Sequence, residues 1–371
     1  MKLMPKITIY DRYIFKQVLI ATCVAILLFI VVWIAPEMLL NTIKKALSGE
    51  YTMKLAVIVL LCEIPLILGK AFPVGLLLGA LFTFDKLSKD SELTIFRAVG
   101  LSFRRILAPV LVLSFIVTGL CFYTCDKLIP KAEAVKAYVK DKHPSTQYIY
   151  TQKDSNNAPK LAVIVSEFKD GLMNDVIVLD FSQKIYTDVH QLSNIYSATL
   201  GEYKGDHWKL SDIKQYNISN DGIFTAIEHV DTMDILSGDT AKNVFTLMSY
   251  STKREREITN SDLKSYISLL KKEELDEEYH YMLNKYFQRF FHPFVCVLLA
   301  IMGTLLGFSK PREQRVIGFT IAIGSIFVYY ITLPFFDLLA EKGILPPLIT
   351  ALFPLIAFSI CIVAFYKTKD L

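Results

Sequence analysis

Long apolar blocks without a charged residue are the feature that most constrains what this chain can fold into. An α-helix needs about 20 apolar residues to cross the hydrocarbon core of a bilayer. Four blocks contain about that number of uncharged residues, and they lie between Lys16 and Glu37, Arg105 and Asp126, Arg315 and Asp337, and Lys342 and Lys367. Each block is long enough to form one transmembrane helix.

Two further apolar segments are less regular. One runs from Phe290 to Ser309 with His292 at its edge, and the other, from Leu55 to Phe84, contains Glu63 and Lys70. Counting both, the sequence predicts an α-helical membrane protein with six transmembrane helices, arranged as three before and three after a long middle segment.

The composition excludes several classes of protein. Only 20% of the 371 residues are charged and 53% are apolar, whereas an ordinary soluble domain has about 25% charged residues. A purely soluble enzyme and a disordered chain are therefore excluded. The net charge of +4 is explained by basic loops next to the predicted helices and gives no reason to expect nucleic acid as a partner.

The basic residues also predict the orientation in the membrane. Four precede the first block, the stretch from Asp85 to Arg105 has five, the stretch from Lys310 to Arg315 has three, and the last loop has only Lys342. Because cytoplasmic loops carry an excess of Lys and Arg, both termini are expected in the cytoplasm and the middle segment outside. The first block is too long for a cleaved signal peptide, so we expect it to remain as a membrane anchor.

The middle segment is predicted to be a separate domain. We divide the chain into 1–126 with three transmembrane helices, 127–289 outside the membrane, and 290–371 with three more. Short β-branched and aromatic runs separated by Asn, Asp and Gly predict an antiparallel all-β domain, a sandwich or jelly-roll-like fold, at about 145–255. A change to helical spacing predicts a linking helix at about 260–272.

A cytoplasmic segment at about 88–100 is predicted to form a short helix between the second and third spans. Glu92 falls in its first turn, where the helix dipole favours an anion, and Gly100 is placed to end it in the left-handed conformation. Leu93, Phe96 and Arg97 are expected on one exposed face. The pattern fits a docking helix and a helix lying on the lipid surface equally well.

Motifs for catalysis are missing from the sequence. The one Gly-Lys pair, Gly69-Lys70, is followed by Ala71 in an apolar run, so it does not form a nucleotide-binding Walker A loop. The six histidines form no zinc-binding pattern. We therefore expect a protein that is not an enzyme and that has no cofactor or metal of its own.

Several motifs together resemble one family. Between a second span broken by Pro65 and Pro73 and the third span lies Ser-Glu-Leu-x-x-x-Arg-Ala-x-Gly-x-Ser, at residues 91–102. Pro130, Phe291-His292-Pro293, the basic loop 310–315, Gly343 to Pro347 and Pro354 extend the match over essentially the whole chain. The sequence resembles the LptF/LptG permeases of the lipopolysaccharide exporter.

The resemblance implies a function and a set of partners. It implies a permease of an ABC transporter that extracts lipopolysaccharide or a related glycolipid from the inner membrane and passes it to a periplasmic jelly-roll bridge protein. ATP would be hydrolysed by a separate ATPase dimer, and a second permease, a paralogue or another copy, would complete the complex. The segment at 88–100 would be the coupling helix, with these residues at the ATPase: Glu92, Leu93, Phe96, Arg97 and Gly100.

Basic residues near the outer ends of the spans are candidates for binding an anionic lipid headgroup: Lys70, Lys127, Lys131, Lys285 and Arg289. Lys70 lies fourteen residues before Phe84, which places it about 21 Å along a straight helix. An ion at that depth is costly when it faces lipid. The alternative for each residue is an ordinary charge near the membrane surface, with Lys70 reaching outward to water.

Small residues recur every four positions on two spans. They are Ala71, Gly75 and Gly79 on the second span, and Gly303 and Gly307 on the fourth. Small residues let helices approach closely. They are expected to form either the seam with the second permease or contacts within this chain, and the second interpretation is preferred for Gly303.

Two functions from other classes remain as alternatives. One is a proton-coupled secondary transporter that uses Glu63 as its proton site and has no ATPase. The other is a membrane anchor for an exposed β module. Copurification of an ATPase in mild detergent discriminates among the three.

Overall fold

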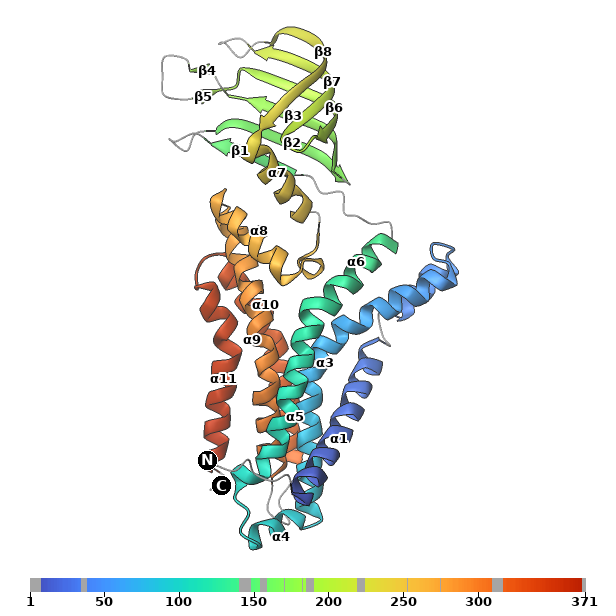
Figure 1. Ribbon diagram of the computed structural model, residues 1–371, viewed down its shortest axis with the longest axis vertical. Helices are drawn as coiled ribbons and strands as arrows, with labels where there is room; N and C mark the ends of the chain where they lie inside the picture. Colours follow the sequence, from blue (N-terminus) through green and yellow to red (C-terminus); the bar gives the residue numbers. More distant parts are fainter. Residues whose placement is uncertain are drawn as a thin grey trace. The chain divides into compact units, whose positions relative to one another are not determined.

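The computed structural model describes residues 8–34, 39–139, 148–153, 159–169, 171–181, 183–184, 190–218, 224–251, 253–273, 275–308 and 316–368 (Figure 1). The chain divides into two compact units. The first consists of Met1–Val139, Thr259–Ile267 and Glu274–Leu371, and the second of Lys140–Ile258 and Ser268–Glu273.

The first unit is helical. Its elements are α1 (Ile9–Ile34), α2 (Leu40–Leu47), α3 (Met53–Lys89), α4 (Glu92–Ala98), α5 (Phe103–Tyr123), the π-helix η2 (Thr124–Leu128), α6 (Ile129–Val139), α9 (Asp276–Gly307), α10 (Val316–Glu341) and α11 (Pro347–Thr368). Helix α8 (Asn260–Lys272) links the two units. Six helical segments in the described residues are long and apolar enough to cross a membrane: Ile9–Ile34, Met53–Lys89, Phe103–Val139, Asp276–Gly307, Ile317–Glu341 and Pro347–Lys367. The prediction of six spans is confirmed.

Helix α3 is the central span, and glycines bring two other helices close to it. A Cβ atom on Gly79 would lie 2.7 Å from the Cα atom of Thr22 in α1, and one on Gly75 would overlap the side chain of Ile26. Ala71, one turn earlier, is fully buried. Of the two alternatives left open for this stripe, Gly75 and Gly79 therefore fit the contact within the chain, because α1 of the same chain packs against them.

The fourth span uses its glycines in the same way. A Cβ atom on Gly303 would overlap the carbonyl oxygen of Leu77 in α3, and one on Gly307 would lie 2.9 Å from the Cβ atom of Phe84. The interpretation of Gly303 as a contact within the chain is confirmed. Close packing of α9 on α3 joins the first three spans to the last three.

The second unit is built on an antiparallel sheet, which confirms the predicted β insertion. Its strands pair in the order β1 (Tyr148–Lys153), β2 (Pro159–Lys169), β3 (Leu172–Asp180), β6 (Asn194–Tyr203), β7 (His207–Ile218) and β8 (Phe224–Ser237) (Figure 1). A separate pair consists of β4 (Gln183–Lys184) and β5 (His190–Gln191). Neighbours in the large sheet are mostly neighbours in sequence, an order that short turns can connect.

One face of this sheet packs against a helix that the strand pattern does not predict. Helix α7 (Gly238–Ser251) directly follows β8 and buries Ala241, Val244 and Met248, whose spacing matches one helix face. The fully buried Trp208 of β7 donates a hydrogen bond from Nε1 to the Ala241 carbonyl at 3.2 Å. Helix α7 is followed by a short 3-10 helix, Glu255–Glu257.

Candidate coupling and lipid sites

The cytoplasmic candidate is α4, which the backbone sets apart from its neighbours. Ser91 before it has φ of 59° and Gly100 after it has φ of 89°. Both values lie in the left-handed region, which ends a right-handed helix and is least costly for glycine. Gly100 therefore has the conformation expected from the sequence. Because α3 continues to Lys89, α4 itself is only seven residues long.

The exposed face of α4 differs from the expected one. Leu93 is only 3% exposed, and the ring of Phe96 packs edge-on against Tyr10 of α1 with centroids 4.8 Å apart. Arg97 is exposed, as expected. The exposed apolar side chains are instead Ile95, at 59%, and Val99, at 78%. The prediction that Leu93 faces outward is wrong, because Leu93 is buried in the helical core. Phe96 is half-buried, because Tyr10 of α1, which is distant in sequence, packs against it.

The start of α1 fastens α4 and α5 to each other. Tyr13 donates its hydroxyl hydrogen to the Glu92 carboxylate, whose two oxygens lie 2.9 and 3.0 Å away. Asp11 forms an ion pair with Arg105 at 2.6 Å. Charge-assisted contacts of this kind are stronger than neutral hydrogen bonds. Glu92, the residue proposed to meet the ATPase, is therefore also a link to α1.

At the opposite end of the spans, called the far end below, Lys70 lies beside α1. Its ammonium nitrogen is 4.9 Å from the centre of the Trp33 ring. A cation over an aromatic face is attracted by the electron-rich ring, most strongly for tryptophan. Lys70 is half-buried, so it lies at a helix contact with part of its side chain accessible.

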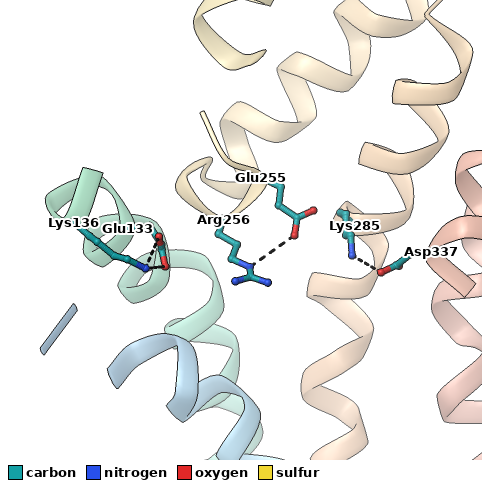
Figure 2. Close-up of polar contacts among 6 residues, drawn as sticks. All are labelled: Glu133, Lys136, Glu255, Arg256, Lys285 and Asp337. Carbon is teal, nitrogen blue, oxygen red and sulfur yellow. Dashed lines mark hydrogen bonds and ion pairs between the residues drawn. The ribbon is translucent and has the colours of Figure 1, made fainter. Parts of the chain in front are cut away.

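Two basic candidates on α9 have partners within the protein. Lys285 pairs with Asp337 of α10 at 2.5 Å (Figure 2), and Asp337 also accepts hydrogen bonds from Asn284 at 2.8 Å and Gln288 at 2.7 Å. Arg289, one turn further along α9, donates to the side-chain oxygen of Asn260 at 3.1 Å. These contacts fix α8 and α10 to α9.

The other two basic candidates lie in the later part of the third span, Phe103–Val139, where η2 and α6 follow α5. Lys127 is 3.3 Å from the carboxylate of its neighbour Asp126, with 54% of its side chain exposed, and Lys131 is exposed on α6. An exposed pair of this kind contributes little to stability. Lys127 and Lys131 are thus the candidates that remain most accessible to a ligand.

A buried group of charges at the far end was missed by sequence analysis. Lys136 of α6 lies 2.5 Å from Glu63 of α3 and 3.2 Å from Glu133, and at most 11% of each side chain is exposed. Figure 2 shows the ammonium group of Lys136 turned toward Glu133. The three-residue spacing of Glu133 and Lys136 could have predicted an ion pair on one helix face, but the contact with Glu63 depends on how α3 and α6 pack.

Helix α2 was also missed. It is amphipathic, with Lys44 and Lys45 in its last turn and Leu40, Ile43 and Leu47 exposed. An apolar face next to lysines is typical of helices that lie at a membrane surface. Its signal in the sequence is weak because α2 has only eight residues.

Clusters of metal-binding side chains are absent from the described part of the chain. No group of three His, Cys, Asp or Glu residues there is placed to bind a metal ion. Several of the described charged residues at the far end form ion pairs instead.

Comparisons with known proteins match a family over nearly the whole chain, including the six spans and the inserted sheet. Residues 12–368 match the family described as lipopolysaccharide export system permease LptF/LptG. The chain is 24% identical over 365 residues to the lipopolysaccharide export system permease protein LptG of Escherichia coli K12, covering 94% of this chain and 95% of that protein. The LptG protein of Escherichia coli O6:H1 strain CFT073 has the same identity and coverage. The chain belongs to the LptF/LptG family of lipopolysaccharide export permeases.

Proposed function

We propose that this protein is the permease subunit of an ABC transporter that extracts lipopolysaccharide, or a related glycolipid, from the inner membrane. The observation that carries the proposal is the family match over residues 12–368. A separate ATPase dimer supplies the energy, since the sequence lacks a Walker A loop. A second permease of the same family, a paralogue or another copy, completes the membrane part.

Coupling to the ATPase occurs through the segment that contains α4, from Glu92 to Gly100. Ile95 and Val99 supply the exposed apolar contact, and Arg97 adds a charge beside it. Leu93 and Phe96 act from the inner face, where they join α4 to the helical core. Apolar side chains exposed to water on a short, braced helix are typical of a protein contact.

The far end faces the periplasm, and both termini lie in the cytoplasm. This orientation follows the excess of Lys and Arg on the α4 side. The inserted sheet then lies in the periplasm, where it receives the lipid and passes it to a jelly-roll bridge protein. Each handover keeps the acyl chains away from water, whose contact with apolar surface is unfavourable.

Lipid stimulation of the ATPase is expected to fall when Lys70 is replaced. Lys70→Glu introduces an anion where the lipid headgroup is proposed to bind, and Lys70→Ala removes the cation. Lys54→Ala is the matched control, because Lys54 is an exposed lysine of the same helix and is not among the headgroup candidates. The measurement is the ATPase rate of the purified complex against added lipopolysaccharide. Stimulation equal to that of the unmodified complex would contradict the role of Lys70.

Copurification tests the proposed function itself. The chain, purified in mild detergent from its native membrane, is expected to bring an ATPase and a second family member with it, in amounts proportional to its own. A proton-coupled transporter using Glu63, or a simple anchor, would be purified without an ATPase. The pairing of Glu63 with Lys136 argues against a free proton-binding carboxylate at that position.

A further inference from the structure

Helix α3 contains Pro73 in its interior, and this leaves one backbone carbonyl without its usual donor. Proline has no N–H, so the carbonyl of Gly69, four residues earlier, loses the hydrogen bond that continues an α-helix. In a membrane no water is present to replace it, and an unsatisfied group costs several kcal/mol. Figure 1 shows that α3 changes direction along its length, as proline-containing helices do.

Side chains of three other helices act as donors at this point. His292 of α9 places Nε2 3.4 Å from the Gly69 carbonyl oxygen, and Cys121 of α5 places Sγ 3.8 Å from it. The next carbonyl, that of Lys70, accepts a hydrogen bond from the hydroxyl of Tyr330 in α10 at 2.8 Å. The interrupted turn of α3 is therefore satisfied from α5, α9 and α10 together.

The second nitrogen of His292 ties this arrangement more firmly to α10. Nδ1 is hydrogen-bonded to the hydroxyl of Tyr329, and the two rings are stacked with centroids 6.0 Å apart. A neutral imidazole with its proton on Nε2 satisfies both contacts, since Nδ1 then accepts from the tyrosine hydroxyl. Two consecutive tyrosines of α10 thus meet α3, one directly and one through His292.

This arrangement determines where Lys70 lies. The Tyr330 hydrogen bond is made to the backbone of Lys70 itself, so it fixes the main chain that carries the ammonium group to the Trp33 ring. A small change in the direction of α3 at Gly69 would displace Lys70 relative to α1. Contacts from α9 and α10 therefore control the position of the Lys70 ammonium group relative to α1.

We infer that His292 and Tyr330 are positioning residues: His292 replaces the backbone donor lost at Pro73, Tyr330 holds the next carbonyl, and together they hold the bend of α3 that places Lys70 beside α1. The role of His292 and Tyr330 in holding α3 does not depend on which lipid is transported. Their effect on lipid binding at Lys70 rests on the proposed function. With alanine at position 73, the backbone N–H of that residue would itself donate to the Gly69 carbonyl, and the side-chain donors would not be needed.

Epistasis between Pro73 and His292 tests the inference. Spin labels on unnatural amino acids at Lys54 in α3 and Glu277 in α9, both exposed, leave the native cysteines in place. We expect His292→Ala and Tyr330→Phe to broaden the distance distribution between the labels. Pro73→Ala shifts the distribution by straightening α3, and His292→Ala adds no further change in that background. The matched control is His280→Ala on α9, which leaves the distribution unchanged.

Lipid stimulation of the ATPase complex in nanodiscs, with purified lipopolysaccharide as the probe, gives the second readout. We expect Tyr330→Phe to raise the lipid concentration for half-maximal stimulation about fivefold, which corresponds to about 1 kcal/mol and to one neutral hydrogen bond. Unchanged distances in His292→Ala, or equal effects of that change with and without Pro73→Ala, would overturn the inference. Altered distances with unaltered lipid stimulation would confirm the positioning role and contradict lipid binding at Lys70.

Discussion

Replacing Lys136 with methionine is expected to destabilise the membrane unit by about 3–5 kcal/mol, the cost of removing one partner from a buried ionic group. The change leaves the carboxylates of Glu63 and Glu133 close together and buried without their shared cation. Like charges in that environment repel each other and cannot be solvated. The thermal unfolding midpoint of the purified protein measures the loss.

Two comparisons show whether charge is the cause. Lys131→Met makes the same substitution at an exposed position of α6 and is expected to leave the midpoint unchanged. Adding Glu63→Gln and Glu133→Gln to Lys136→Met removes the unpaired charges and is expected to restore most of the stability, because neutral groups of similar size tolerate burial better. Equal midpoints for Lys136→Met and Lys131→Met would contradict the importance of the buried group.

Replacing Ile95 or Val99 with glutamate is expected to detach the ATPase while the permease remains folded. Both side chains are exposed in the permease alone, so a charge there costs little until a partner covers it. A central apolar contact in an interface commonly contributes about 2 kcal/mol or more, equivalent to about 30-fold in affinity. The measurement is the amount of ATPase that copurifies with each variant, together with its dissociation constant.

The control for this prediction is Ile227→Glu, which changes an equally exposed isoleucine in β8 of the other unit. It is expected to retain the ATPase. Leu93→Ala, in contrast to the changes at the exposed Ile95 and Val99, removes a buried side chain. It is expected to lower the free energy of unfolding of the permease by about 2–5 kcal/mol. Normal ATPase binding by Ile95→Glu and Val99→Glu would show that α4 does not dock through these residues.

The spans and the inserted sheet could be predicted because they depend on local patterns. A run of about twenty uncharged residues favours a transmembrane helix, and alternating β-branched residues favour a β-strand. Both preferences hold whatever tertiary contacts the segment makes. The role of Gly100 could be predicted for the same reason. Helix α7 was missed because its helical spacing follows directly after a strand, inside a stretch that was assigned to the β domain as a whole.

The orientation of side chains could not be predicted where distant segments meet. Leu93 and Phe96 form a regular pattern with Arg97, but Tyr10 covers Phe96, and nothing local in the sequence indicates that. Likewise, Lys285 and Lys136 look alike as basic residues near span ends, and only the fold brings Asp337 and Glu63 to them. The sequence shows which charged residues lie near the ends of the spans, but it does not show which residues they pair with.

We propose that this permease is a lipid gate and that a separate ATPase moves it through α4. The most direct test is transfer of lipopolysaccharide from proteoliposomes to a soluble lipid-binding acceptor, measured with the permeases alone, with the complete complex, and with or without ATP. We predict transfer only from the complete complex with hydrolysable ATP. Transfer by the permeases alone, or transfer that follows an imposed proton gradient without ATP, would contradict the claim.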